Sequence, residues 1–318
     1  MTTETLSPAI SAAELTQDIQ IFEYSKAANP IDSGATPRIP IKTFSADSYA
    51  TGRSRVIELD LSADLKVPYP ATGPSLLASF VRIVKGDSLT TTCVASSEFF
   101  YVIRGSGFSE VTVDGELKSI AWSEGDFVAL PGLEARHTAE QDTAFYMVND
   151  SPLFAYLGAE KGRSRFAPTL YKRDVVLAEL IEAQNDPEAA TRSRISVLLA
   201  NKNFEQTMTI THVLWTMFGV ALPNSRQLPH RHQSVALDFV VDAQPGAYTL
   251  LGEELDNTGN IKNPLRVDWV KGSAFVTPPG WWHEHVNASA HNAYVMPIQD
   301  AGLHTYLRTL DIQFYEED

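Results

Sequence analysis

The chain has 318 residues, of which 44% are hydrophobic and 20% are charged, and its formal net charge is −14. This length suits two domains, and the composition excludes a disordered or low-complexity protein. The acidic balance argues against binding to nucleic acid or to an anionic membrane surface. Cys93 is the single cysteine, so the sequence predicts no internal disulfide and no cysteine-based zinc site.

The N-terminal region, residues 1–55, is typical of an arm rather than a domain. It lacks the basic and apolar stretches of a signal peptide. No later apolar run approaches the ~20 residues that cross a bilayer, so we expect a cytoplasmic protein. A short helix is expected near residues 12–24, followed by a segment spaced by proline and glycine.

From residue 56 to about residue 165 the sequence consists of short runs rich in Val, Phe, Tyr, Ile and Thr, separated by Gly, Asp and Pro. Such runs predict the strands of a sandwich or barrel. Asp114-Gly115 lies within one of them and predicts a hairpin with a two-residue type I′ turn, because both turn positions need a positive φ. We therefore predict a first β-barrel over residues 56–165.

Residues 166–195 interrupt the strand pattern. Within them, residues 172–185 place their apolar side chains on one helical face, and Asp186-Pro187 ends the helix. Strand-like runs resume after this connector and continue to the end of the chain. The sequence thus predicts a helical connector followed by a second barrel over residues 196–318.

The two β regions have the pattern of a duplicated domain. A motif runs from Trp122 to Pro131 in the first region and from Trp269 to Pro278 in the second. In both, Gly follows Trp by three positions and Pro follows Gly by six. A repeat of this length indicates two copies of one domain rather than a solenoid.

Four of the eight histidines form two pairs, His230 with His232 and His283 with His285. Residues i and i+2 of a strand face the same side, so His230 and His232 can aim two imidazoles at one point. A third histidine on a neighbouring strand would complete a facial set of neutral nitrogen donors. Such a set leaves half of a metal ion's coordination sphere open for a substrate and a second reactant.

Residues 272–287 match the second cupin motif, Gly-x5-Pro-x-Gly-x2-His-x3-Asn, at every position. The sequence therefore resembles the cupins, which are small double-stranded β-helix barrels. This resemblance implies that His283 is the third metal ligand beside His230 and His232. It leaves His285 as a neighbour that does not bind the metal.

Within the cupins, residues 228–252 and 272–287 resemble one family in particular, because they are similar to the iron region of gentisate and salicylate 1,2-dioxygenases. Members of that family are bicupins, so the resemblance implies an all-β fold of two jelly-roll barrels joined by a helical connector. It also implies a non-haem Fe(II) enzyme that uses O2 to open the ring of a small hydroxylated or aminated aromatic carboxylate. His285 would act as an acid or base, or would hydrogen-bond the bound oxygen or substrate. Bicupins are commonly homo-oligomers, and the arm would suit contacts between copies.

One departure from the family concerns the substrate. Asp238 stands where the family carries an arginine for the substrate carboxylate, and two carboxylates repel each other. Either Arg226 or Arg231 supplies the cation, or the substrate carries an amine or a second hydroxyl that suits Asp238. Trp281 and Trp282 are expected to stack on the aromatic ring. The expected pocket also includes Phe239 and Tyr248.

A second departure concerns which barrel binds the metal. The family usually has its metal in the N-terminal barrel, whereas the histidines of this chain lie in the C-terminal one. In the N-terminal barrel the two histidine places fall on Thr92 and Val94, which offer no nitrogen donor. Arg136 stands in the third ligand place, with His137 one residue late. We therefore expect a structural barrel without a metal site, and His137 on its surface.

Two other interpretations of the histidines remain open. Three histidines also bind Zn, Mn or Ni, which would support hydrolytic, isomerase or decarboxylase chemistry, with Glu284 as the base if it faced the metal. The other interpretation is a bicupin that binds a small ligand without catalysis.

Overall fold

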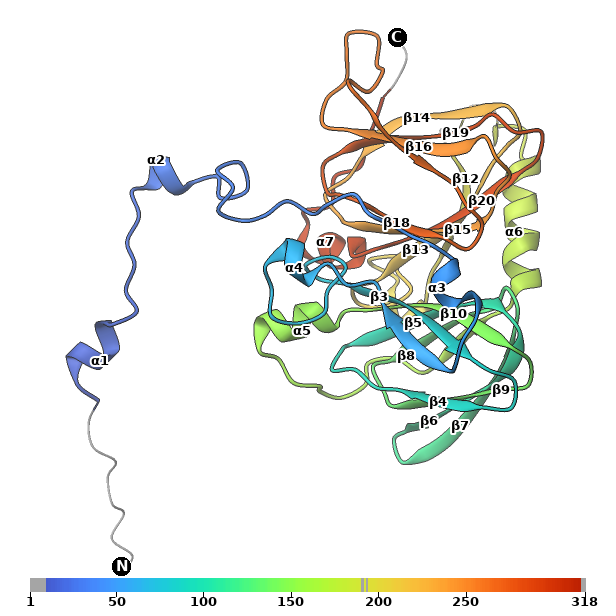
Figure 1. Ribbon diagram of the computed structural model, residues 1–318, viewed down its shortest axis with the longest axis horizontal. Helices are drawn as coiled ribbons and strands as arrows, with labels where there is room; N and C mark the ends of the chain where they lie inside the picture. Colours follow the sequence, from blue (N-terminus) through green and yellow to red (C-terminus); the bar gives the residue numbers. More distant parts are fainter. Residues whose placement is uncertain (1–9, 190–191, 193, 316–318) are drawn as a thin grey trace, which may run out of the picture. The chain divides into compact units, whose positions relative to one another are not determined.

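The computed structural model describes residues 10–189, 192 and 194–315 (Figure 1). The expected arm, connector and second barrel also include residues 1–9, 190–191, 193 and 316–318, which lie outside the described residues. The chain divides into a short unit, Met1–Arg38, and a large unit, Ile39–Asp318. Across the described ranges, none of the helices combines the length and the hydropathy that a membrane span requires.

The short unit contains α1 (Ala12–Thr16) and α2 (Tyr24–Ala27), where the sequence predicted one helix near residues 12–24. α1 begins at a capping box in which Ser11 and Glu14 each accept a hydrogen bond from the other's backbone. Neither helix buries a residue. The two pieces remain short because helices of this size gain their stability mainly from packing.

The described residues of the large unit form four antiparallel sheets, two for each barrel, and these confirm the predicted all-β class. The sheets of the N-terminal barrel are, in spatial order, β11 (Thr169–Tyr171), β8 (Phe127–Pro131), β5 (Ser97–Arg104), β10 (Thr143–Asn149), β3 (Leu77–Ile83) and β2 (Arg55–Glu58), and then β4 (Ser88–Thr91), β9 (Ala135–Ala139), β6 (Ser106–Val113) and β7 (Glu116–Ser123). Those of the C-terminal barrel are β1 (Thr43–Phe44), β18 (Ala274–Thr277), β15 (Ala236–Asp242), β20 (Ala293–Gln299), β13 (Trp215–Ala221) and β12 (Ile195–Leu199), and then β17 (Leu265–Asp268), β16 (Ala247–Gly252), β19 (Trp282–Asn287), β14 (Ser225–Arg231) and β21 (Gln313–Phe314).

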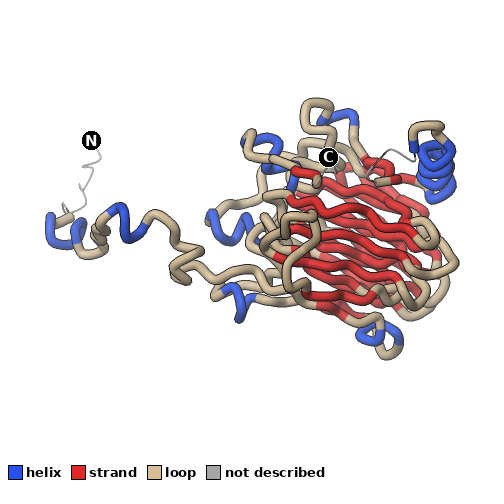
Figure 2. The backbone as a smooth tube through the Cα atoms, turned by 90° about the horizontal axis from the view of Figure 1, so that it is seen from above, coloured by secondary structure: helices blue, strands red, loops and turns tan. Residues whose placement is uncertain are grey.

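Helices lie at the periphery of the large unit, while strands fill its interior (Figure 2). Residues 39–55, expected to belong to the arm, contribute β1, which pairs with β18, and α3, which buries Tyr49. The helices described for this unit include α3 (Asp47–Ala50), α4 (Ser62–Leu65), α5 (Ser151–Leu157), α6 (Arg173–Asn185), the 3-10 helix η2 (Lys202–Phe204) and α7 (Ala301–Leu307).

The connector helix and the tight hairpin form where the sequence predicted them. α6 ends just before Asp186-Pro187, buries Val176 and Leu180, and packs against β12. Asp114 and Gly115 have φ values of 51° and 83° and join β6 to β7. Positive φ at both positions is the signature of the type I′ turn.

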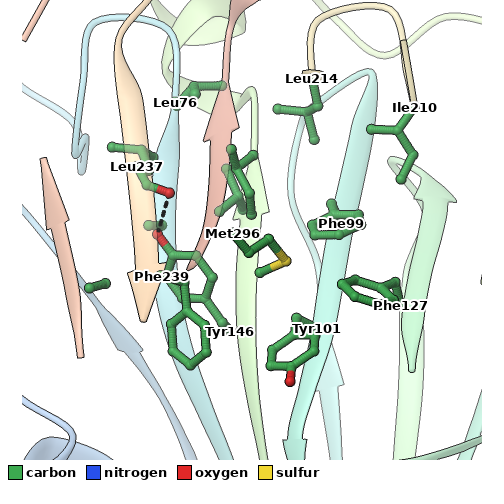
Figure 3. Packing of buried hydrophobic residues seen from close by; sticks show 14 of the residues in the cluster. Leu76, Phe99, Tyr101, Phe127, Tyr146, Ile210, Leu214, Leu237, Phe239 and Met296 are labelled. Atoms are coloured by element: carbon green, nitrogen blue, oxygen red, sulfur yellow. Dashed lines mark hydrogen bonds between the residues drawn. The ribbon is translucent and has the colours of Figure 1, made fainter. Parts of the chain in front are cut away.

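The facing six-stranded sheets of the two barrels share one aromatic core (Figure 3). The rings of Phe239 in β15 and Tyr146 in β10 stack with centroids 4.9 Å apart, and the Tyr146 hydroxyl donates to the carbonyl of Leu237 at 3.5 Å. Because side chains alternate along a strand, Leu237 and Phe239 face this core while Asp238 faces the barrel interior. Phe239, expected in the pocket, therefore packs between the barrels instead.

The internal repeat appears in the backbone as well as in the sequence. Gly125 and Gly272 have φ values of 86° and 78°. Their amides donate to the carbonyls of Val102 and Val240, each at 2.8 Å. Equivalent turns thus close both barrels.

Candidate metal centre

Three imidazoles meet inside the C-terminal barrel. His230 in β14 pairs across the sheet with His283 in β19, and His232 follows β14 by one residue. All three side chains are buried, and one ligand atom from each lies within 4.8 Å of the other two. No other group of three or more His, Cys, Asp or Glu side chains in the described ranges meets the same criterion.

Each of these imidazoles is anchored through Nδ1 to a backbone carbonyl. The carbonyl partners are His283 for His230 at 3.0 Å, Ser234 for His232 at 2.9 Å and Trp281 for His283 at 3.0 Å. An Nδ1–H that donates to a carbonyl leaves Nε2 with a free lone pair, which is the form that binds a metal. The Nε2 atom of His232 is buried and has no hydrogen-bond partner. The donor set therefore fits a transition-metal ion that prefers nitrogen ligands.

Burial also keeps these histidines neutral. It lowers the pKa of His232 to about 4 and holds the pKa values of His230 and His283 well below the ordinary value. Protons therefore do not compete with a metal ion for the imidazoles at neutral pH.

His285 lies on the same face of β19 as His283, and their ring centroids are 5.9 Å apart. Trp269 Nε1 donates to Thr249 Oγ1 at 2.8 Å, and this oxygen lies 2.8 Å from His285 Nδ1. A hydroxyl has one proton to donate, so all three groups are satisfied when Thr249 donates to Nδ1. The His285 proton then sits on Nε2, and His285 presents a hydrogen-bond donor to the site.

Arg194, just before β12, is a residue of this site that the sequence analysis missed. Its Nη2 lies 2.6 Å from His230 Nδ1, and its Nη1 is buried without a partner. Burial lowers the pKa of Arg194 to about 9, while the charge of Asp238 acts in the opposite direction. Arg194 belongs to no motif and stands 36 residues before His230. The one sequence signal that could have indicated Arg194 is its place two residues before Ser196, because residues i and i+2 of a strand face the same side, here the barrel interior.

Asp238 is buried on the interior side of β15. Its carboxylate accepts a hydrogen bond from Thr277 Oγ1 at 2.7 Å. Burial raises the pKa of Asp238 to about 7, against the opposing effects of Thr277 and Arg194. Asp238 thus lies inside the barrel that holds the histidines, as a substrate-binding role requires.

Two of the other expected substrate contacts, Arg226 and Trp282, lie on the outer face of the barrel. Arg226 forms an ion pair with Glu284 at 2.7 Å, and Glu284 alternates with the inward-facing histidines of β19. Arg226 therefore does not face the site, and neither does Glu284 as a candidate base. The Arg231 guanidinium lies 5.0 Å from the ring centroid of Trp282, on the same outer face of the barrel. Trp281 is half-buried and packs against the apolar cluster of the barrel interior.

Tyr248, expected in the pocket, also lies on the outer face of its strand. The Arg266 guanidinium stacks 3.7 Å from its ring centroid. Its neighbour Thr249 points inward to His285 instead. The alternation along β16 separates the two roles.

The register of the N-terminal barrel corrects the expected positions there. His137 pairs with Ser109 as His285 pairs with Thr249, which makes Ala135 the counterpart of His283. The chain between the Pro of the motif and this strand is one residue shorter in the first copy. The assignment of Arg136 to the ligand place is therefore wrong.

The expectation of a surface His137 is also wrong, because His137 is 1% exposed. Thr91 pairs with Ala135 as His230 pairs with His283. Thr91 and Cys93, rather than Thr92 and Val94, thus occupy the first two ligand places. These positions hold a hydroxyl, a thiol and a methyl group instead of three imidazoles.

The chain is similar to known ring-cleaving dioxygenases over half of its length. It is 30% identical to gentisate 1,2-dioxygenase 1 of Aquipseudomonas alcaligenes over 158 residues, which are 50% of this chain and 42% of that protein. It is 25% identical to 5-aminosalicylate 1,2-dioxygenase of a Comamonas species over 166 residues, or 50% of this chain and 41% of the relative. The chain thus matches less than half the length of these relatives. No protein-family model matches it.

Solved structures resemble nearly the whole chain. Salicylate 1,2-dioxygenase of Pseudoaminobacter salicylatoxidans, in an adduct with gentisate, superposes with a TM-score of 0.70 at 12% identity, covering 99% of this chain and 98% of that one. A variant of oxalate decarboxylase from Bacillus subtilis superposes with a TM-score of 0.56 at 14% identity, covering 80% and 76%. The chain therefore has the bicupin fold, with its histidine cluster in the second barrel.

Proposed function

We propose that this chain is a non-haem Fe(II) dioxygenase of the gentisate type, which opens the ring of a small aromatic carboxylate with O2. The convergence of three neutral imidazoles, with a buried Nε2 of His232 that has no partner, is the observation that carries the proposal. The sequence similarity to two ring-cleaving dioxygenases supports iron and oxygen chemistry over the Zn, Mn or Ni alternatives and over ligand binding without catalysis. The likeness to oxalate decarboxylase rests on fold alone.

His230, His232 and His283 would hold the ion on one face and leave the opposite face for ligands. When bound, Fe(II) would let electron density pass from a chelated phenolate to O2. The protein's own contribution is to keep the three imidazoles neutral and oriented, through burial and the three carbonyl contacts described above. A proton-free lone pair is then available at Nε2 of His232 and His283 at neutral pH, and at Nε2 of His230 once Arg194 releases Nδ1.

Two interior charges suit a substrate that carries both an acid and a donor. The Arg194 guanidinium has an N–H group without a partner, and it would pair with the substrate carboxylate. Asp238 accepts hydrogen bonds, so it would favour a ring amine or second hydroxyl. Gentisate and 5-aminosalicylate, for which the two relatives are named, each combine these groups. We propose substrates of this class for this chain.

His285 would serve as a hydrogen-bond donor rather than as a base. Its Nε2–H, set by the contact of Nδ1 with Thr249, would donate to a substrate oxygen or to O2. Placing a fixed donor where negative charge develops lowers the barrier without reorganisation of the site. The cytoplasmic location and the homo-oligomeric state stay predictions from the sequence.

The test is oxygen uptake by anaerobically loaded Fe(II) protein with gentisate, 5-aminosalicylate, salicylate and hydroquinone. We expect uptake with gentisate or 5-aminosalicylate, and its loss when iron is removed or in His283→Ala. His291→Ala, which changes an exposed histidine, is the matched control and should keep both iron and uptake. Absence of uptake with all four compounds, in protein that holds one iron per chain, would contradict the proposal.

A further inference from the structure

Two adjoining cavities, of about 230 Å³ and 320 Å³, lie in the large unit where the two barrels meet. Both are lined by residues of the N-terminal barrel and of the C-terminal barrel, and they share Tyr101, Ile103, Glu124, Val241 and Lys271. We call the two together the seam cavity. None of the three histidines of the metal centre lines it, so it is a separate space.

Four aromatic rings form a continuous row along the wall of the smaller cavity. The ring centroids of Tyr101 in β5 and Phe127 in β8 are 5.1 Å apart. Phe218 in β13 continues the row at 5.8 Å from Phe127, and Tyr294 in β20 follows at 5.9 Å from Phe218. Aromatic rings attract one another at centroid distances of ~4.5–7 Å, so a ligand ring in this cavity would extend the row. The wall therefore favours an aromatic ligand.

The hydroxyl of Tyr101 is open to the seam cavity. The residue as a whole is 6% exposed, and its hydroxyl forms no hydrogen bond with any residue that the structure describes. Its oxygen is nevertheless not among the fully covered polar atoms without a partner, so it keeps some accessible surface. Figure 3 shows the hydroxyl pointing away from Phe99 and Met296 of the core. The hydroxyl is therefore available to a ligand.

Two unpaired charges of opposite sign lie beside this hydroxyl. Glu124 and Arg173 line the cavity, and the charges of both act on Tyr101. Within the described ranges neither side chain forms a hydrogen bond or an ion pair, with the other or with a third residue. The remaining cation and anion of the smaller cavity, Lys271 and Asp242, pair with each other at 3.3 Å. One free cation and one free anion thus face the same space.

These groups match a ligand that carries one charge of each sign. Burial raises the pKa of Tyr101, so its hydroxyl keeps its proton at neutral pH and can donate. A carboxylate can accept from this hydroxyl and from the Arg173 guanidinium together. An ammonium group can donate to the Glu124 carboxylate. A ligand with only one of these groups would leave either Arg173 or Glu124 unpaired.

We propose that the seam cavity binds a zwitterionic aromatic amino acid. Its carboxylate accepts from Arg173 and from the Tyr101 hydroxyl, and its ammonium group donates to Glu124. Its ring continues the aromatic row of the wall. The bound amino acid touches both barrels, and the site is independent of the metal centre and of the proposed dioxygenase activity.

Calorimetric titration of the full chain with L-phenylalanine, 3-phenylpropionate, phenethylamine and L-alanine tests the proposal. The second compound lacks the ammonium group, the third lacks the carboxylate and the fourth lacks the ring. Because exposed ion pairs contribute modestly, we expect phenylalanine to bind about threefold or more tightly than phenylpropionate and phenethylamine, and alanine to bind more weakly still. Failure of phenylalanine to bind, or equal binding by any analogue, would overturn the proposal.

Variants of the two charged side chains assign the groups of the ligand. Arg173→Gln should weaken phenylalanine and phenylpropionate about threefold and leave phenethylamine unchanged. Glu124→Gln should weaken phenylalanine and phenethylamine to a similar degree and leave phenylpropionate unchanged. Glu179→Gln changes an exposed residue of α6 outside the cavity and is the matched control, with no effect on any ligand. Equal losses for all three ligands, or no loss in either variant, would overturn the proposal.

Tyr101→Phe removes the hydroxyl and keeps the ring of the aromatic row. It should weaken phenylalanine and phenylpropionate about threefold, the worth of a typical hydrogen bond, and leave phenethylamine unchanged. Unchanged binding of phenylalanine would show that the hydroxyl does not meet the carboxylate, and would overturn the assignment.

Amino acids also chelate metal ions, so the location of the ligand needs its own test. His283→Ala removes a ligand of the metal centre and should bind phenylalanine as the unaltered chain does. Leu177 of α6 lines the seam cavity and is half-buried, so Leu177→Trp should fill the space and block phenylalanine. Binding lost in His283→Ala and retained in Leu177→Trp would move the amino acid to the metal centre and overturn the proposal.

Discussion

Two neighbours make opposite demands on the Nδ1 atom of His230. The carbonyl oxygen of His283, at 3.0 Å, needs a proton on that nitrogen, whereas the Arg194 guanidinium, at 2.6 Å, needs a lone pair. Ligation of a metal through Nε2 requires the protonated form of Nδ1. Metal binding and the contact with Arg194 therefore exclude each other.

Replacing this arginine should tighten metal binding. Arg194→Leu removes both the competing hydrogen bond and a positive charge beside the ion, so we expect the Kd for Fe(II) or Zn(II) to fall about tenfold, or ~1.4 kcal/mol. Competition with a chelator measures the Kd. Arg192→Leu, which removes an exposed arginine paired with Asp186, is the control and should leave the Kd unchanged. An unchanged or higher Kd in Arg194→Leu would show that the two contacts do not compete.

The buried carboxyl of Asp238 should make the stability of the metal-free chain depend on pH. Its folded pKa is about 7 and its ordinary value is 3.8, so the folded state holds a proton that the unfolded state releases between these values. This group's contribution is therefore present below about pH 4 and is lost as the pH rises through 7.

Asp238→Asn should thus stabilise the chain at pH 8 by a few kcal/mol and have little effect at pH 4. Urea unfolding at the two pH values measures the difference. The exposed Asp268→Asn serves as the control, with no change expected at either pH. Equal effects of Asp238→Asn at pH 4 and pH 8 would contradict the raised pKa of Asp238.

Among single residues, the sequence predicted the histidines better than their surroundings. The spacing of the motif places His283 in register with His230, because both lie on neighbouring strands at fixed positions. It could not place Arg226, since a register shift between Gln227 and His230 interrupts the alternation of β14. Arg194 escaped prediction because only the folded barrel brings its segment to the histidines.

Across elements, the pairing of β16 with β19 determines what His285 can do. Thr249 stands opposite His285 in this pairing, and the Thr249 hydroxyl oxygen accepts a hydrogen bond from Trp269 Nε1. The same contacts recur in the other barrel, between β6 and β9, without metal ligands beside them. The duplicated chain therefore supplies an internal control for the role of the hydroxyl.

Thr249→Val removes the donor to Nδ1 while keeping the shape of the side chain. We expect iron to be retained and kcat to fall at least tenfold with little change in KM, because the Nε2–H form of His285 is no longer enforced. Nitrogen NMR of the ring in Zn(II)-loaded protein should show the change of tautomer. Thr249→Ser should restore both kcat and the tautomer.

Ser109→Ala breaks the equivalent contact to His137 in the N-terminal barrel. Its cost to folding should resemble that of Thr249→Val, but kcat should stay unchanged. If kcat fell equally in Ser109→Ala and Thr249→Val, the effect of Thr249→Val would reflect lost stability rather than a role in catalysis.

Local chemistry explains which elements could be predicted. The turn at Asp114-Gly115 and the end of α6 at Asp186-Pro187 depend on backbone restrictions that any sequence displays directly. The single helix expected near residues 12–24 failed because its apolar residues, such as Ile21 and Phe22, remain exposed among the described residues. Packing, which a periodic pattern cannot reveal, decides such segments.

At the scale of the whole large unit, the barrels are joined through the aromatic core between their six-stranded sheets. Phe239 from the C-terminal barrel contacts Phe80, Tyr101 and Tyr146 of the N-terminal barrel. The sequence predicted two barrels of one plan, but a strand with apolar residues on both faces does not indicate which partner covers its outer face. The shared core was therefore outside the reach of the sequence.

Phe239→Ala should destabilise both barrels together. The loss of a buried aromatic ring costs ~3–5 kcal/mol, and the cavity would lie between the two sheets. Differential scanning calorimetry should show one transition at lower temperature for the whole unit. Phe314→Ala, which removes a ring that is 45% exposed, should have a much smaller effect. Separate transitions for the two barrels would show that the core does not couple them.

The location of this core has a consequence for how the duplicated chain could evolve. Because the barrels adhere through the outer faces of their sheets, the residues that hold the pair together are not those that line either interior. Substitutions inside one copy can therefore accumulate without dissolving the pair. Ala135 and His283 illustrate such divergence, since these equivalent positions carry a methyl group in one barrel and an imidazole in the other.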